Sequence, residues 1–223
     1  MKNSSPINDL EKFLQLTSYK SLEENMIVDK EVYTEITKKI ENLKLNNFRT
    51  AQEKGTYFEN FINDLIDKTR LYIRKCNVNT STNEIDIRVE LEPGQSMLAE
   101  RYHSILKEVA FIECKNYPKS KVNVTYIGKF YSLLKTSKKK LGIIISPNGL
   151  TGQEWKDGHG LCKKIALKDD TNIISLTFDD LLQLNQKSLL MIIKEKLIEL
   201  EEDISISNLI EPHELESNNN FKK

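Results

Sequence analysis

Three cysteines in 223 residues are too few and too scattered to build a covalent or zinc-bound framework. Cys76, Cys114 and Cys162 form no C-x-x-C pair, so the sequence indicates neither a disulfide scaffold nor a cysteine zinc site. No apolar run approaches the length of a bilayer-spanning helix, and MKNSSPINDLEKF lacks the apolar stretch of a secretion signal. We therefore expect a soluble, cytoplasmic protein with no membrane partner.

The chain also lacks net charge, because 33 basic residues balance 33 acidic ones. Overall charge thus gives no reason to expect a polyanionic partner. The distribution is uneven, since eight lysines and no acid lie from Lys115 to Lys140. Such a stretch can be the electrostatic footprint of a phosphate backbone, and it can equally be a solvated helix face and loop. A G-x-x-x-x-G-K-[ST] loop is missing, so any NTP-driven step would need another protein.

Hydrophobic periodicity predicts an alternation of helices and strands. Apolar spacing of three to four residues predicts helices before residue 50, over 50–68, around 127–134 and 153–167, and near the end from 177 and 189. Alternating or continuous apolar residues predict strands at LYIRKCNV, EIDIRVEL, VAFIECK, LGIIIS and NIISL. Pro93-Gly94 indicates an irregular connection through Ser104. The later strand-helix-strand steps imply parallel neighbours, so the fold class is α/β with a mixed sheet.

Three regions follow from this order. Residues 1–49 are expected to be an N-terminal helical appendage, 50–205 the α/β domain, and 206–223 a polar, flexible tail. With 39% hydrophobic residues, the chain can build one such domain and a modest addition to it.

Two charged side chains end the strand VAFIECK. Glu113 and Lys115 are one residue apart, so on a strand they share a face and Cys114 points to the other. An ionised pair at the end of a buried strand is costly unless it has a role, and catalysis is one such role. Cys114 is then expected to be a small buried hydrophobe whose backbone carbonyl can serve as a metal ligand.

Asp86 lies on the polar face of the preceding strand and could meet Glu113 across the sheet. Carboxylate oxygens are the ligands of Mg²⁺, which can neutralise a phosphodiester and activate water. Taken alone, Asp86 also suits a simple reading as one more polar member of an amphipathic strand.

Four motifs in order resemble a known family. KGTYFENFI, NEIDI, FIECKNY and LGIIISP look like the successive motifs of the Asp…(Asp/Glu)-x-Lys superfamily of restriction-endonuclease-like nucleases, and are most similar to its Mrr-like branch. The resemblance covers about Ala51 to Leu184. It implies a restriction-endonuclease-like mixed central sheet flanked by helices, and it leaves the N-terminal helices unexplained.

The resemblance also implies roles. Asp86 and Glu113 would bind Mg²⁺ or Mn²⁺, and Lys115 would position or activate the attacking water. Glu59, which matches the acid of the first core helix, would act on metal through water or a second ion; its simpler reading is a solvated acid at a helix edge.

Three lysines, Lys119, Lys121 and Lys129, would suit nucleic-acid backbone contacts beside the cut site, with Tyr117 and Tyr126 between them. The alternative is that they serve solubility. His103, His159 and His213 lack metal-ligand spacing and are expected to be ordinary histidines, and Trp155 a packing residue.

The first functional hypothesis is a Mg²⁺-dependent DNA endonuclease of bacterial or phage restriction and antiviral defence. A Holliday-junction or repair nuclease is a close variant. Alternatives are a catalytically idle module that binds nucleic acid or a protein, and a pure interaction protein. A homodimer would suit double-strand cutting, and the N-terminal helices could hold a partner protein of a defence system.

Overall fold

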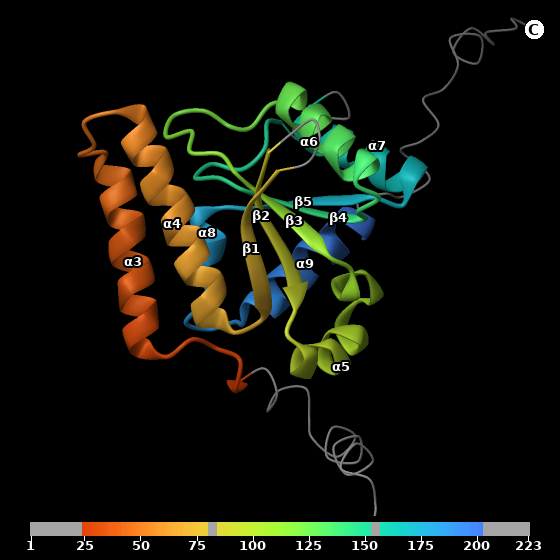
Figure 1. Ribbon diagram of the computed structural model, residues 1–223, viewed down its shortest axis with the longest axis horizontal. Coiled ribbons are helices and arrows are strands. Elements are labelled where there is room, and N and C mark those ends of the chain that lie inside the picture. Colours follow the sequence, from red (N-terminus) through yellow and green to blue (C-terminus); the bar gives the residue numbers. More distant parts are fainter. Residues whose placement is uncertain (1–23, 80–83, 153–156, 203–223) are drawn as a thin grey trace, which may run out of the picture.

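A computed structural model of the chain describes residues 24–79, 84–152 and 157–202, and gives an α/β fold (Figure 1). The expected helix around Leu10 to Leu14, Trp155, His213 and the predicted tail lie outside these residues. No helix in the described parts combines the length and the apolar character needed to cross a membrane.

The centre of the fold is one five-stranded sheet in the order β1-β2-β3-β4-β5. The first three strands pair antiparallel and the last three parallel, so the prediction of a mixed sheet is confirmed. The strands are β1 (Tyr72–Asn79), β2 (Glu84–Leu91), β3 (Ala110–Cys114), β4 (Leu141–Ile145) and β5 (Asn172–Leu176).

Helices cover both faces of the sheet, with α6 and α7 on one side and α9 on the other (Figure 1). The α-helices are α3 (Lys30–Leu45), α4 (Ala51–Thr69), α5 (Pro93–Tyr102), α6 (Val124–Thr136), α7 (Gly158–Asp169), α8 (Phe178–Leu181) and α9 (Leu189–Glu202), with a 3₁₀ helix η1 (Ser104–Lys107) after α5. The capping box expected from Thr177 and Asp180 begins α8.

Strand β2 buries alternate residues, as the alternation of apolar and polar residues in its sequence predicts. Ile85, Ile87 and Val89 are at most 1% exposed, and the polar residues between them reach solvent in part. The buried strand β4 packs closely under α6, as a short continuous apolar strand requires. Asp86 therefore stands on the polar face of a strand whose other face is core.

The segment after β2 departs from the prediction. Residues 93–102 form helix α5 instead of an irregular connection. Proline needs no hydrogen-bond partner for its nitrogen and has a helical φ, so it is well suited to the first position of a helix. Pro93-Gly94 begins a helix here, whereas we expected the start of an irregular connection.

Helix α3 belongs to the same hydrophobic core as the sheet. Its residues Ile36, Ile40 and Leu43 are at most 2% exposed and join one cluster with the α4 residues Phe58 and Ile62. Helices α3 and α4 lie side by side, with α4 between α3 and β1 (Figure 1). Helix α3 thus packs against α4, the helix that carries Glu59, and stabilises its position.

Candidate active site

The pairing of β2 with β3 stops where their acidic residues begin. The last recorded pair of this antiparallel ladder is Ile87 with Ile112, and the next positions outward on the two strands are Asp86 and Glu113. Cross-strand neighbours in an antiparallel pair point to the same face of the sheet. The two carboxylates therefore belong to one face and to one end of the strand pair.

A side chain replaces the backbone ladder at this point. The Asp86 carboxylate accepts a hydrogen bond from the Cys114 backbone N–H, at 2.8 Å. On the other edge of β3, the Lys115 N–H donates to the carbonyl of Ile145 on β4. Since N–H groups alternate in direction along a strand, the Cys114 N–H and C=O both face β2. Asp86 is thereby oriented by β3 itself.

Glu113 and Lys115 form an ion pair, with Lys115 Nζ 2.5 Å from Glu113 Oε1. Their side chains are only 18% and 23% exposed. Burial raises the pKa of Glu113, and repulsion from Asp86 raises it further, against the lowering effect of Lys115. Burial by itself would lower the pKa of Lys115, but its attraction to Glu113 and Asp86 leaves it raised. Lys115 is thus held as a cation among acids.

Glu59, on helix α4, also acts electrostatically on Glu113 and Cys114. Its charge contributes to raising the pKa of both Glu113 and the buried thiol of Cys114. The helix is fixed in place by Phe58, which is 1% exposed and packs edge-on against Phe178 of α8. The structure thus brings Asp86, Glu113 and Lys115 together at one end of the sheet, and the charge of Glu59 acts on them from α4.

No three His, Cys, Asp or Glu side chains in the described residues form a ready-made metal cage. Mg²⁺ does not need one, because it commonly keeps several waters and binds one or two carboxylates and substrate phosphates. Asp86, Glu113 and the Cys114 carbonyl supply such an oxygen set at one strand end. Burial first, and then repulsion from Asp86, raise the pKa of Glu113, and a bound cation would offset that repulsion. The residues present fit a divalent ion.

Cys114 itself is 7% exposed and packs in the core, as expected for a small hydrophobe. Cys114 and Cys162 are both free thiols. Burial raises the pKa of Cys162 to about 12, so this thiol stays protonated. Neither side chain is suited to nucleophilic work.

The three lysines expected to touch nucleic acid have different surroundings. Lys129 of α6 lies 5.6 Å from the centre of the Tyr126 ring, and Lys115 lies 5.7 Å from the same centre. Tyr117 meets that ring edge-on at 5.6 Å. Tyr126 therefore lies between Lys129 and Lys115. We call Asp86, Glu113 and Lys115 the charged cluster. Lys119 is exposed on the loop after β3.

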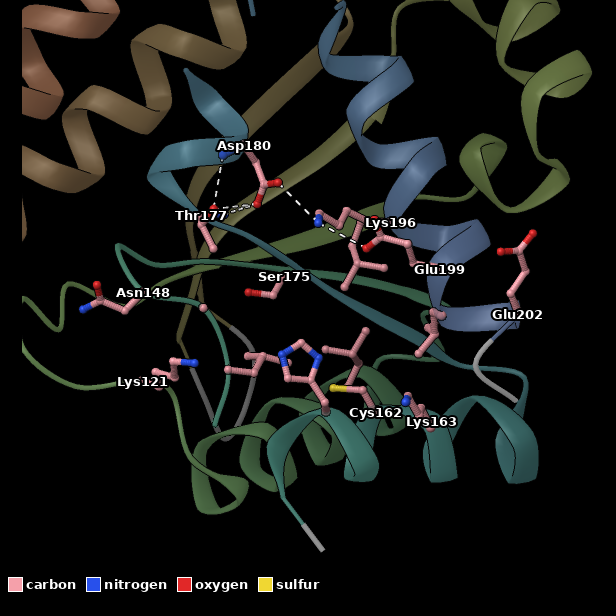
Figure 2. A pocket seen from close by; sticks show the side chains of 16 residues that line it. Lys121, Asn148, Cys162, Lys163, Ser175, Thr177, Asp180, Lys196, Glu199 and Glu202 are labelled. Carbon is pink, nitrogen blue, oxygen red and sulfur yellow. Dashed lines mark hydrogen bonds and ion pairs between the residues drawn. The ribbon is translucent and has the colours of Figure 1, made fainter. Parts of the chain in front are cut away.

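Lys121 lines a cavity of about 730 Å³ along the edge of β5 (Figure 2). The cavity is walled by residues of β5, α7 and α9, among them Ser175, Lys163 and Lys196. Lys196 is paired there with Asp180 at 3.3 Å. The acidic residues of the strand ends are not part of its lining. An enzyme that acts on a polymer needs an open groove at the reacting group, so the volume of this cavity does not locate the chemistry.

Two histidines have ordinary surroundings. His103 pairs with Glu201 at 2.9 Å and caps the 3₁₀ helix through its other ring nitrogen. His159 lines the cavity beside β5. Sequence reasoning missed Lys54 and Asn116, which are in contact next to the charged cluster. A lysine on a helix and an asparagine after a strand carry no motif that would have marked them.

Comparison with known proteins assigns the family. Residues 50–177 match Mrr_cat, a family described as restriction endonuclease, and these residues are more than half of the chain. The chain belongs to this restriction endonuclease family. A search of curated proteins found no match. The matched region of this Mrr-like nuclease begins at the N-cap of α4 and ends after β5, so it includes the strand ends that carry Asp86, Glu113 and Lys115.

Proposed function

We propose that this nuclease is a Mg²⁺- or Mn²⁺-dependent endonuclease that hydrolyses phosphodiester bonds in DNA. The observation that carries the proposal is the meeting of Asp86 and Glu113 where the β2–β3 ladder ends, with Lys115 ion-paired beside them. Two carboxylates and an ammonium at an open strand end suit a reacting phosphate better than they suit packing.

Each residue has a distinct task in this proposal. Asp86 and Glu113, with the Cys114 carbonyl, hold the divalent ion, which would supply charge neutralisation of the phosphate and a more acidic water. Lys115 donates hydrogen bonds to the attacking water or to a phosphate oxygen, and its raised pKa keeps the donor charged. Glu59 acts from α4 through a water or a second ion.

Nucleic acid approaches over the α6 side of the site. Tyr126 is 37% exposed and lies between Lys115 and Lys129, while Lys119 is exposed on the adjoining loop. Acids are missing from residues 115–140, so nothing on this segment repels a phosphate backbone. Lysine next to an exposed aromatic ring is a pairing typical of nucleic-acid contacts.

Restriction and antiviral defence in a bacterium or phage is the role that the family suggests. Double-strand cutting would bring two copies of the chain together on DNA. The N-terminal helices could then bind a partner protein of the defence system, since α3 presents its outer face to solvent.

Cleavage assays with matched variants test the proposal. The full chain is incubated with Mg²⁺, Mn²⁺ or EDTA and with plasmid, linear, single-stranded and branched DNA and with RNA. Cleavage of DNA that needs the metal and disappears in Asp86→Ala and Lys115→Ala supports it. Lys140→Ala is the control, because this lysine is exposed and paired with Asp170.

Binding measurements on the same proteins separate the alternatives. Lys115→Ala is expected to keep its affinity for DNA within about tenfold, because one phosphate contact is a small part of a backbone footprint. Tight binding by the parent chain without cleavage of any substrate would favour the idle binding module. Cleavage that persists in EDTA would contradict the metal-dependent mechanism, and cleavage of branched DNA alone would favour the resolvase variant.

A further inference from the structure

A small second cavity lies next to the charged cluster. It has a volume of about 200 Å³ and lies between the α3–α4 hairpin and the loops after β3 and β4. Leu43, Pro118, Pro147 and Phe178 form an apolar wall, and the polar groups come from Lys44, Lys54, Asn116, Asn148 and Asp179. Pockets for drug-sized ligands are commonly about 300–1,000 Å³, so this cavity suits a smaller group.

Lys54 brings a buried positive charge to this cavity. Its residue surface is 6% exposed, and its Nζ donates to Asn46 Oδ1 at 2.6 Å. No ion pair with a carboxylate is recorded for it within residues 24–79, 84–152 and 157–202. An ammonium carries three donors, and a buried one is costly without acceptors. Burial accordingly lowers the pKa of Lys54.

Asn116 brings an acceptor to the same place. Its Nδ2 donates to the backbone carbonyl of Lys54 at 3.3 Å, which fixes the orientation of the amide. Its Oδ1 is buried and has no hydrogen-bond partner in the described structure. Buried polar atoms nearly always have a partner, so an unsatisfied one beside a cavity points to a ligand that supplies a donor.

The cavity thus offers a buried cationic donor, a buried neutral acceptor and an apolar wall, and Asp179 adds a carboxylate to its lining that disfavours an anionic ligand. A phosphate would suit the ammonium, but its oxygens would repel Asn116 Oδ1. A nucleobase with a carbonyl beside a ring N–H satisfies both groups at once, with the carbonyl on Lys54 and the N–H on Asn116. Guanine and thymine, or uracil in RNA, carry that pair on the Watson–Crick edge.

We propose that this cavity binds an unpaired guanine or thymine base next to the phosphodiester that is cut; this inference rests on the proposed nuclease function. Asn116 directly follows Lys115, and Lys54 lies five residues before Glu59 on α4. Two of the elements that wall the cavity, α4 and the segment after β3, therefore also carry Glu59 and Lys115. A base can enter only when it is out of its stack, which is easiest in single-stranded, bulged or mismatched DNA.

The first test is equilibrium binding in EDTA, which needs no cleavage. Duplexes with one bulged nucleotide, either G, T, A, C or an abasic residue, are titrated with the parent chain and with Lys115→Ala. We expect bulged G and T to bind about tenfold more tightly than the abasic bulge, in line with one to two base contacts. Equal affinity for all five duplexes would overturn the proposal, whether or not the chain cleaves DNA.

Variants then assign the preference to the cavity. Asn116→Ala and Lys54→Met should each reduce the roughly tenfold preference for bulged G and T over the abasic bulge to less than about threefold. Each variant removes one of the two proposed contacts to the base. Lys68→Met is the matched control, since it removes a lysine from the same helix outside the cavity. Thermal unfolding of each variant confirms that it is folded. A preference that survives in both cavity variants would contradict the assignment.

Sequencing of cleavage ends separates this inference from the proposed function. If the chain cuts, we expect G or T to be enriched at one fixed position beside the cut for the parent and Lys68→Met, and not for Asn116→Ala. Cutting without any base enrichment would refute the base cavity and leave the nuclease proposal intact. A bulge preference in a chain that never cuts would support the cavity and contradict the nuclease proposal.

Discussion

The Asp86 carboxylate is hydrogen-bonded to the backbone N–H of Cys114, at the point where β2 and β3 stop pairing. The interaction joins two strands through a side chain instead of through the ladder. It also fixes the direction of a carboxylate that we propose as a metal ligand. Asp86 therefore contributes both to the stability of the fold and to the proposed catalysis. Two substitutions at Asp86 can distinguish these contributions.

Asp86→Asn should lower cleavage on the order of 100-fold or more, because the charge that holds the cation and acts on the phosphate is lost. Its amide oxygen can still accept from Cys114, so the free energy of unfolding should change by less than about 1 kcal/mol. Asp86→Ala should lose cleavage and also about 1–3 kcal/mol of stability, because a backbone N–H loses its acceptor. Urea unfolding and cleavage rates measure the two effects.

Glu90→Gln is the control for both substitutions, since Glu90 lies further along β2 and pairs with Arg88. It should cleave at the parent rate. Full cleavage by Asp86→Asn would remove Asp86 from the proposed site, and equal stability of the Asn and Ala variants would show that the Cys114 hydrogen bond contributes little.

A second prediction concerns the titration of Glu113. Its pKa should lie above that of an exposed glutamate, because it is buried and faces Asp86. Asp86→Asn removes the repelling charge and should lower this pKa, whereas Lys115→Met removes the attracting charge and should raise it. Carbon-13 NMR of the glutamate carboxyl groups over a pH series measures the shifts. Opposite directions in either variant would contradict the electrostatic description.

The raised pKa of Glu113 affects both the pH dependence of stability and the binding of metal. The folded state binds the Glu113 proton more tightly than the unfolded state, so its contribution to the free energy of unfolding falls as pH rises through the folded pKa. A divalent cation needs the ionised form and should bind more weakly as pH falls through the same range. Isothermal titration with Mn²⁺ at several pH values should show this weakening at a higher pH than for an exposed carboxylate.

Much of the fold could be predicted from the sequence, because strict alternation in EIDIRVEL and short, bounded apolar runs such as LGIIIS are typical of strands. EIDIRVEL became β2 with its apolar residues inward, and Glu113 and Lys115 share a face for the same reason. The register between β2 and β3 could not be predicted, since a slip of one residue would turn Asp86 away from Glu113. Only the folded chain supplies that register.

Other features depend on tertiary contacts that leave no local pattern. Lys119, Lys121 and Lys129 are near one another in sequence, but Lys129 lies beside the Tyr126 ring whereas Lys121 lines the β5 cavity. Lys54 looks like a solvated helix residue until α3 and the β3 loop cover it. Such positions are decided by packing between distant segments.

Tyr126 and Lys129 give a third prediction. Tyr126→Ala should weaken DNA binding by about 5- to 100-fold, the range for loss of one stacked base, because its ring is exposed beside Lys115. Lys129→Ala should weaken binding less and reduce the slope of log affinity against log salt by about 0.7–0.9. Fluorescence anisotropy at several salt concentrations measures both. Lys135→Ala on the same helix, where Lys135 pairs with Asp169, should leave the slope unchanged.

The fourth prediction concerns how closely α6 packs on the sheet. A Cβ added at Gly142 of β4 would lie 2.6 Å from both Leu134 Cδ1 and Phe130 Cε1, two buried side chains of α6. Gly142→Ala should therefore destabilise the fold by about 1–3 kcal/mol through overpacking. Gly128, on α6 itself, has no such neighbour within 4 Å, so Gly128→Ala should stabilise the helix by about 0.5–1 kcal/mol.

Urea unfolding of the two alanine variants measures the difference, and the same proteins can be assayed for DNA binding. Because α6 carries Tyr126, a helix pushed away from β4 by Gly142→Ala should also bind DNA more weakly, whereas Gly128→Ala should bind as the parent does. A Gly142→Ala protein as stable as the parent would mean that α6 can move away from β4 without a loss in the free energy of unfolding. The position of Tyr126 would then not depend on the sheet, and the link between core packing and nucleic-acid contact would fail.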